Sequence, residues 1–183
     1  MRVITGSARG KKLKEFAGME IRPTTDRVKE SIFNIIQFEI EGRNVLDLFG
    51  GTGQLGIECL SRGAARCTFV DISREAANLI RENLTSTNLA DKARVAQEDS
   101  LSFLRGCREK FDLILLDPPF NSGLLEKTLE TITAIDILTK NGIIVCERAL
   151  GTQLPELKAP YGQAREYRYG KIAIALYRPA AEV

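Results

Sequence analysis

The stretch that decides the fold is NVLDLFGGTGQLG, residues 44–56. Its first part, residues 44–49, is a short apolar run that predicts a buried strand, and a helix is expected over residues 55–63. The glycines between them allow a tight turn and let the backbone approach a ligand that a Cβ atom would repel. A strand, a glycine turn and a helix in this order indicate the first unit of a doubly wound α/β fold.

The same alternation continues along the chain in both directions from this unit. Apolar runs predict strands at 67–71, 93–97, 111–117 and 142–147, and helical periodicity predicts helices at 74–88, 100–106 and 123–138. Residues 165–169 and 171–178 are typical of an antiparallel pair, and a helix is expected from Thr24 to before Gly42. We therefore expect a Rossmann-like, mostly parallel sheet of seven strands with an antiparallel edge hairpin, preceded by a small N-terminal arm and helix.

Length and composition predict one domain and limit its chemistry. The chain has 183 residues, 44% of them apolar, and we divide the expected domain into an extension over 1–41 and a catalytic core over 42–183. It has no histidine, and its four cysteines are far apart, which excludes Ser-His-Asp and Cys-His systems and predicts no metal site. No apolar run is long enough for a membrane span or signal peptide, so a cytoplasmic protein is expected.

Acidic residues are expected where successive strands end. In doubly wound sheets the ligand binds beyond these ends, and Asp71 follows the second strand at the position that commonly holds ribose hydroxyls. The turn matches the dinucleotide pattern G-x-G-x-x-G, but Asp47 just before it would repel a pyrophosphate and attract the cationic groups of S-adenosylmethionine. Asp99 could accept the adenine amino hydrogen, or could only cap the following helix. The residues expected at this cofactor are Asp47, Phe49, Gly50, Gly51, Thr52, Gly53, Asp71, Ile72, Asp99 and Ser100.

The sequence Asp117-Pro118-Pro119-Phe120 ends the fourth expected strand. An exocyclic base amine is a poor nucleophile until both of its N–H bonds are held by acceptors, and Asp117 with the carbonyl of Pro118 can supply them. The two prolines fix the backbone before the base arrives, and Phe120 offers a face for stacking. These four residues are the expected catalytic loop, although a rigid turn with Phe120 in the core is the alternative.

Several longer segments resemble the RsmD-type bacterial 16S rRNA guanine-N2 methyltransferases. The matching segments are RVITGSARGKKL (2–13), RPTTDRVKESIFNII (22–36), DLFGGTGQLGIECLSRGA (47–64), FVD (69–71), DPPF (117–120) and YGKIAIALYR (169–178). The resemblance implies methylation of N2 of one guanine in 16S rRNA of the small ribosomal subunit, with S-adenosylmethionine as the methyl donor. Many base-amine methyltransferases have Asn where this chain has Asp117, which keeps the acceptor role and questions a role as a base.

Charge is distributed unevenly along the chain. Residues 1–30 carry eight Lys or Arg and four acids, residues 148–178 carry six and two, and residues 31–147 carry twelve and seventeen. Such basic ends suit a polyanion, although solvated faces are the alternative. The residues expected to bind RNA are Arg2, Arg9, Lys11, Lys12, Arg22 and Arg27, with Lys14 beside them and a second basic region at Arg165, Arg168 and Lys171. The basic residues of the arm are expected to lie outside the cofactor fold, where their mutual repulsion offers no benefit to folding.

Three other functions remain open from the sequence. D-P-P-aromatic loops also serve N6-adenine and N4-cytosine methyltransferases, although the DNA enzymes commonly carry an added recognition region. An NAD-dependent dehydrogenase would use the G-x-G-x-x-G match, and an RNA-binding assembly factor could retain the fold without catalysis. We expect a monomeric methyltransferase that acts on 16S rRNA in the small subunit or a late assembly intermediate.

Overall fold

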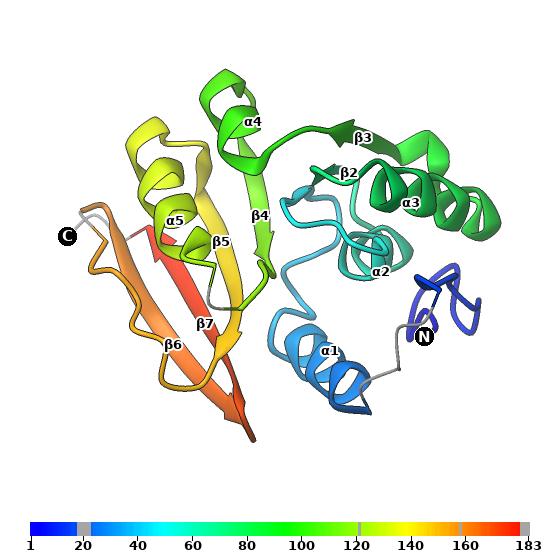
Figure 1. Cartoon of the computed structure of the whole chain (residues 1–183), viewed down its shortest axis with the longest axis horizontal. Coiled ribbons are helices and arrows are strands. Elements are labelled where there is room, and N and C mark those ends of the chain that lie inside the picture. The colour runs from blue at the N-terminus through cyan, green and yellow to red at the C-terminus, as the bar shows by residue number, and fades with distance from the viewer. Residues whose placement is uncertain (18–22, 121, 158, 180–183) are drawn as a thin grey trace.

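The strands form one sheet in the order β3-β2-β1-β4-β5-β7-β6 (Figure 1). The structure is a computed structural model that describes residues 1–17, 23–120, 122–157 and 159–179. Strands β1 to β5 pair in parallel, and β7 runs antiparallel to β5 and β6. The expected fold class is therefore confirmed. The strands are β1 Asn44–Asp47, β2 Arg66–Asp71, β3 Ala93–Gln97, β4 Phe111–Leu116, β5 Leu138–Ala149, β6 Tyr161–Tyr169 and β7 Ile172–Pro179.

Helices cover both faces of the sheet, and each face has its own apolar core. The helices are α1 Pro23–Ile35, α2 Gln54–Ser61, α3 Arg74–Thr87, the 3-10 helix η1 Ala90–Lys92, α4 Ser100–Gly106 and α5 Leu124–Ile135. Side chains of the arm, α1, α2 and α3 form one core with one face, and α4 and α5 form the second core with the other face. Strand order reverses between β1 and β4, which places the ligand-binding edge at their carboxyl ends.

The N-terminal arm, residues 1–17, is packed against the domain. It forms a small hairpin through the bridge between Arg2 and Lys12, and Figure 1 shows it beside α2 and α3. Val3, Ala8 and Leu13 are buried in the first core. The arm therefore contributes to the first core through its apolar side chains.

One helix boundary differs from the sequence prediction. Helix α5 ends at Ile135, and not at 138, because Asp136 adopts a left-handed conformation with φ 50°. The Asp136 carboxylate accepts hydrogen bonds from Lys110 Nζ at 2.7 Å and Tyr161 Oη at 2.6 Å, which hold the turn. Leu138 then begins β5 opposite Phe111. Among the described residues, no helix is long and apolar enough to cross a membrane.

Candidate active site

Asp71 holds the glycine turn in place. Its Oδ2 accepts a hydrogen bond from Gly51 N at 2.9 Å, and its Oδ1 accepts one from Ser73 N at 2.8 Å. The carboxylate thus joins the end of β2 to the turn after β1, although the two lie 20 residues apart in the chain. Ile72, next to Asp71, is 71% exposed, which leaves an apolar side chain uncovered beside this turn.

The glycines of the turn serve different purposes. A Cβ atom at Gly50 would lie 2.7 Å from Ile80 Cδ1, and one at Gly56 would lie 2.3 Å from Phe69 Cε1. A side chain at either position would collide with the packed core, so glycine has a packing role at both. Gly51 and Gly53 have positive φ values of 53° and 80°, and a Cβ at Gly51 would meet only the Phe49 carbonyl, at 4.0 Å. The turn is therefore open to a ligand at Gly51.

Asp47 is buried with half of its carboxyl unsatisfied. It is 1% exposed, and its Oδ2 accepts a hydrogen bond from Gly56 N at 2.9 Å. Its Oδ1 has no hydrogen-bond partner within the described part of the chain. Burial raises the pKa of Asp47 to about 7, the Gly56 bond opposes this shift, and the charges of Asp117 and Asp71 add to it. An ammonium or other cationic donor would satisfy the free oxygen, so the site fits the predicted cofactor.

The remaining residues expected at the cofactor lie around the same edge with different surroundings. Asp99 caps α4, because its Oδ1 accepts a hydrogen bond from Ser102 N at 3.0 Å. The helix-cap alternative is therefore confirmed, and a contact with adenine stays a prediction. Thr52 is buried and donates through Oγ1 to Met1 Sδ at 3.6 Å, Ser100 is buried, and Phe49 is half-buried.

The Asp117–Phe120 loop leaves β4 at the same edge of the sheet. Asp117 is half-buried, and burial raises the pKa of its carboxyl. Pro118 is buried and Pro119 is exposed, and the Pro119 carbonyl accepts a hydrogen bond from Ser122 Oγ at 2.7 Å. Phe120 is 37% exposed and belongs to neither core, so the core alternative for Phe120 is wrong. The loop offers an acceptor and an aromatic surface together.

Sequence reasoning missed two acids, Glu147 and Glu58, that the structure distinguishes. Glu147, near the end of β5, has a raised pKa because of burial and the neighbouring charge of Asp117. Its sequence signal was an acid at the end of the strand over 142–147. Glu58, on α2, is completely buried and binds the backbone of the arm: Ile4 N at 2.8 Å and Thr5 N at 2.9 Å. No local pattern indicates that role.

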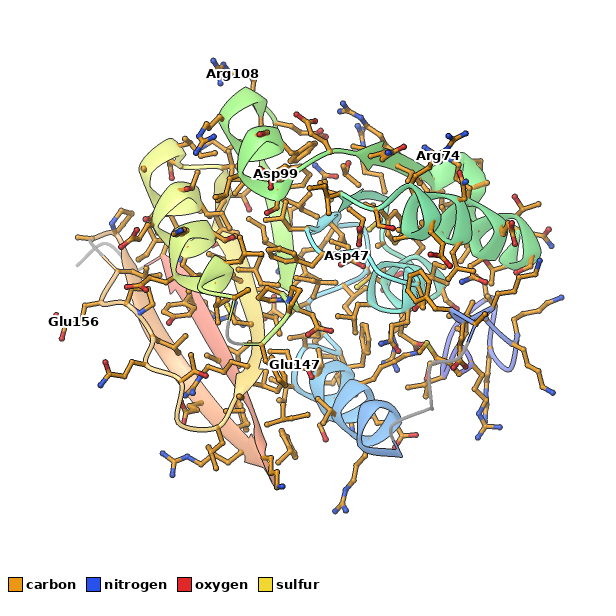
Figure 2. The ribbon with its side chains drawn as sticks, viewed as in Figure 1. Asp47, Arg74, Asp99, Arg108, Glu147 and Glu156 are labelled. Atoms are coloured by element: carbon orange, nitrogen blue, oxygen red, sulfur yellow. The ribbon has the colours of Figure 1, made fainter. Side chains whose placement is uncertain are left out.

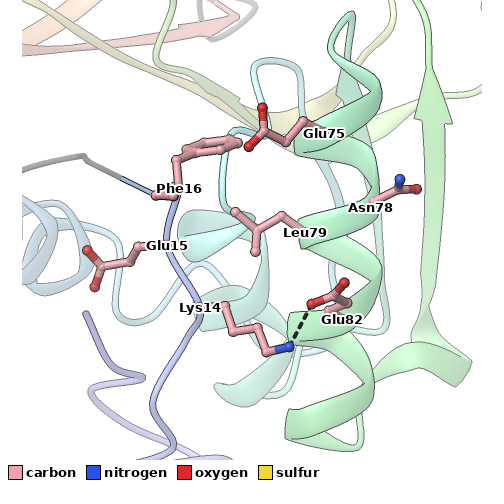
Figure 3. A pocket seen from close by; sticks show the side chains of 8 residues that line it. Lys14, Glu15, Phe16, Glu75, Asn78, Leu79 and Glu82 are labelled. Carbon is pink, nitrogen blue, oxygen red and sulfur yellow. Dashed lines mark hydrogen bonds and ion pairs between the residues drawn. The ribbon is translucent and has the colours of Figure 1, made fainter.

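A pocket of about 480 Å³ lies between the end of the arm and α3 (Figure 3). Lys14, Glu15, Phe16, Ala17, Glu75, Asn78, Leu79 and Glu82 line it. None of the residues predicted for the cofactor or the base is among them. Lys14 Nζ bonds to Glu82 Oε2 at 2.8 Å, and Glu15 pairs with the N-terminal amine of Met1. Because its other charged residues are acidic, this pocket does not suit a phosphate backbone.

The basic residues expected to bind RNA differ in their exposure and in their ion pairs. Arg2, Arg9, Lys11, Lys12 and Arg27 are exposed. Lys14 is engaged with Glu82, and Arg22 lies outside the described residues. In the second basic region, Arg168 Nε pairs with Glu166 Oε1 at 2.9 Å, while Arg165 and Lys171 are exposed. The arm is therefore the less neutralised of the two basic surfaces. Among the described residues, no group of three or more Asp, Glu, His or Cys side chains is arranged to hold a metal ion.

Comparisons with known proteins agree with this architecture. The family model described as Conserved hypothetical protein 95 matches residues 1–178. "Ribosomal RNA small subunit methyltransferase D" of Escherichia coli K12 is 36% identical, over 100% of this chain and 91% of its own. The protein of the same name from Haemophilus influenzae is 37% identical, over 80% and 78% of the two chains.

Solved structures extend the similarity to three dimensions. The Escherichia coli protein yhhF superposes with a TM-score of 0.89 at 36% identity, covering 100% of this chain and 99% of that one. A hypothetical protein of Thermus thermophilus superposes with a TM-score of 0.82 at 26% identity, covering 97% and 99%. The family match and the full-length relatives confirm the resemblance seen in the sequence. The chain belongs to the Conserved hypothetical protein 95 family, the family of the RsmD-type rRNA methyltransferases.

Proposed function

We propose that this protein methylates the exocyclic N2 amine of one guanine in 16S rRNA, with S-adenosylmethionine as the methyl donor. The observation that carries the proposal is the arrangement of Asp47, Asp71 and the Asp117–Phe120 loop along one edge of the sheet. Asp47 lies one strand away from the loop, because Asp47 pairs with Leu115, two residues before Asp117. An acidic cofactor site and a rigid acceptor loop are thus neighbours.

Asp47 and the glycine turn suit the cationic donor. The free Oδ1 of Asp47 can accept a hydrogen bond from the ammonium group of S-adenosylmethionine. The open space at Gly51 leaves room for the amino-acid part of the same molecule. When bound, S-adenosylmethionine supplies a methyl group whose bond to sulfur breaks with the electron pair left on sulfur. In this proposal Asp71 binds the ribose hydroxyls, and its bond from Gly51 N supports the turn beside them.

The Asp117–Phe120 loop suits the acceptor base. Asp117 and the Pro118 carbonyl accept the two N–H bonds of the amine, which aims its lone pair at the methyl group. The exposed face of Phe120 can stack on a base that has left its helix or loop. Nitrogen forms the new bond to carbon with its lone pair and then releases one proton, for which Asp117 is the nearest acceptor in the loop.

The exposed cations of the arm, together with Arg27 on α1, suit the RNA backbone. Arg2, Arg9, Lys11, Lys12 and Arg27 carry no ion pair among the described residues, and the arm's hairpin is fixed to the domain by Glu58. A rigid basic surface would hold the small subunit, or a late assembly intermediate, while the loop receives the guanine. The proposal includes action as a monomer in the cytoplasm, and the division into an RNA-facing extension over 1–41 and a core over 42–183.

The experiment that tests the function uses labelled S-adenosylmethionine and small subunits from a strain that lacks the modification. The products are digested to nucleosides and separated. Recovery of labelled N2-methylguanosine supports the proposal, and recovery of N6-methyladenosine or N4-methylcytidine would replace it. Asp117→Ala is the matched inactive control. Calorimetry with S-adenosylmethionine and with NAD, each without RNA, separates a methyltransferase from a dehydrogenase.

A further inference from the structure

Three neighbouring strands end in acids on the same face of the sheet. Asp47 ends β1, Asp117 follows β4, and Glu147 lies near the end of β5. Leu116 pairs with Cys146 in the parallel β4–β5 ladder, so the next residues, Asp117 and Glu147, follow side by side. Their same-face predecessors, Leu115 and Val145, both lie in the core shared with α1 and α2. The side-chain period of two therefore places both carboxyls on that face.

Asp117 is a charged neighbour that acts on Glu147, since its charge adds to the effect of burial in raising the pKa of Glu147. On β7 the residue opposite Glu147 is the apolar Ile174. The next cation along β5, Arg148, is directed elsewhere, since its side chain pairs with Glu166 and donates to the Thr152 carbonyl at 2.7 Å. On α1, Lys29 donates to the Arg2 carbonyl at 2.9 Å and lies 3.4 Å from Glu58 Oε2.

Further negative charge lies beyond Asp117 rather than near Glu147. Asp117 is coupled electrostatically to Asp47, which in turn is coupled to Asp71. Figure 2 places Asp47 and Glu147 in the middle of the molecule and Glu156 at its periphery. No cation within the described residues forms an ion pair with Glu147. A half-buried carboxyl beside a second carboxyl, with no ion pair to a cation of the described residues, favours the protonated form.

We propose that Glu147 is a positioning residue that shares one proton with Asp117, so that the base site carries a single negative charge at neutral pH. The raised pKa values of both carboxyls support this, with the larger rise at Glu147. Two interacting carboxyls titrate as a pair, in two steps that belong to both groups.

The pair completes the proton transfer of the proposed reaction, on which this inference rests. After the amine nitrogen has bonded to carbon, one N–H bond breaks and its electrons stay on nitrogen. The proton forms an O–H bond at Asp117, because Glu147 already holds the shared proton and leaves Asp117 ionised. The pair then carries two protons and no charge, and it returns one proton to solvent. A base whose pKa is near the working pH accepts and releases protons most effectively.

The first test needs neither RNA nor turnover. Glutamate carboxyls are labelled with ¹³C, and the Glu147 signal is identified as the one missing in Glu147→Gln. We expect it to titrate well above the ordinary glutamate range, and to fall by at least about one pH unit in Asp117→Asn, which removes the neighbouring charge. S-adenosylmethionine, which carries one more positive charge than S-adenosylhomocysteine, should lower the Glu147 midpoint further than S-adenosylhomocysteine does. A midpoint in the ordinary range that Asp117→Asn leaves unchanged would overturn the proposal.

The second test measures single-turnover methylation from about pH 5 to about pH 9. We expect Glu147→Gln to slow the step about 10-fold at pH 7 and to remove the upper of two ionisations from the pH profile. Glu156→Gln, a peripheral and exposed glutamate, is the matched control and should change neither. A wild-type rate with a wild-type profile in Glu147→Gln would also overturn the proposal. If the product proves to be a different methylated nucleoside, the function proposed above fails. The carboxyl titration would still show whether Glu147 and Asp117 share a proton.

Discussion

Two buried carboxylates on adjacent elements, Glu58 on α2 and Asp47 on β1, differ in how far their oxygens are satisfied by hydrogen bonds. Glu58 is 0% exposed and both of its oxygens are occupied, by groups of the arm, α1 and α2: Ile4 N, Thr5 N, Lys29 Nζ and Arg62 Nε. Asp47 is 1% exposed and accepts one hydrogen bond, from Gly56 N, while its second oxygen has no partner among the described residues.

The difference separates a structural acid from a functional one. A buried charge that is fully hydrogen-bonded and paired can fix an element in place, whereas a buried carboxyl with a free oxygen destabilises the empty fold. Glu58 joins the arm and α1 to the domain. Asp47, which is affected by the charges of Asp117 and Asp71, leaves hydrogen-bonding capacity for ligands. The fold therefore uses Glu58 for stability and leaves Asp47 available for a ligand.

The largest effect on stability is expected from removing Glu58. We expect Glu58→Ala to lower the free energy of unfolding by about 3–5 kcal/mol, because Lys29 and two backbone amides lose their buried partner. Urea denaturation measures the change, and Glu58→Gln, which keeps one acceptor, should lose less. A loss below about 1 kcal/mol would mean that the arm is not held by this residue.

Removing Asp117 should affect catalysis and not folding. We expect Asp117→Ala to lower single-turnover methylation at least about 100-fold, roughly 3 kcal/mol in the transition state, because the amine loses an oriented acceptor. The free energy of unfolding should stay equal or rise, since burial raises the pKa of this carboxyl. Calorimetry should give an S-adenosylmethionine affinity close to wild type. More than about a tenth of wild-type turnover would contradict the assignment.

Asp47→Asn should raise the stability of the ligand-free protein and weaken its affinity for S-adenosylmethionine. The folded-state pKa of Asp47 is raised to about 7 from an ordinary value of 3.8, so between these values the folded state binds more protons than the unfolded state. Stability of the ligand-free wild type therefore falls as pH rises through this window, and asparagine removes that loss. We expect a melting temperature higher by about 5 °C at pH 8 and little change at pH 4. S-adenosylmethionine binding should weaken, and a variant that binds it normally would show that Asp47 is a structural acid.

The smallest effect is expected from the arm's surface. Replacing Arg9, Lys11 and Lys12 with Ala should leave the fold and the cofactor affinity intact, because these side chains are exposed and Glu58 holds the backbone. Subunit binding should weaken, and its salt slope should flatten by roughly one unit for each lost phosphate contact. The charge-matched control replaces Lys92, Arg105 and Arg108, which are exposed elsewhere. Equal affinities and parallel salt slopes for the wild type and the arm variant would make the arm a solvated face.

Local patterns predicted most of the fold because its elements carry their own signals. The order of strands and helices, the glycine turn and the acids at the ends of β1 and β2 could be identified from periodicity and spacing. Helix α5 was predicted three residues too long, because its end depends on Asp136, whose partners Lys110 and Tyr161 lie 26 and 25 residues away. No helical pattern contains that information.

The sequence by itself determined the fold class, the glycine turn, the acids beside it and the rigid loop after β4, since each is a property of consecutive residues. Only the tertiary structure decided which acids are satisfied. Glu58 accepts a hydrogen bond from Ile4 across 54 residues, and Glu147 and Asp117 follow neighbouring positions only because β5 pairs with β4. Burial and partner geometry set the pKa of a carboxyl, and both arise when distant segments pack together.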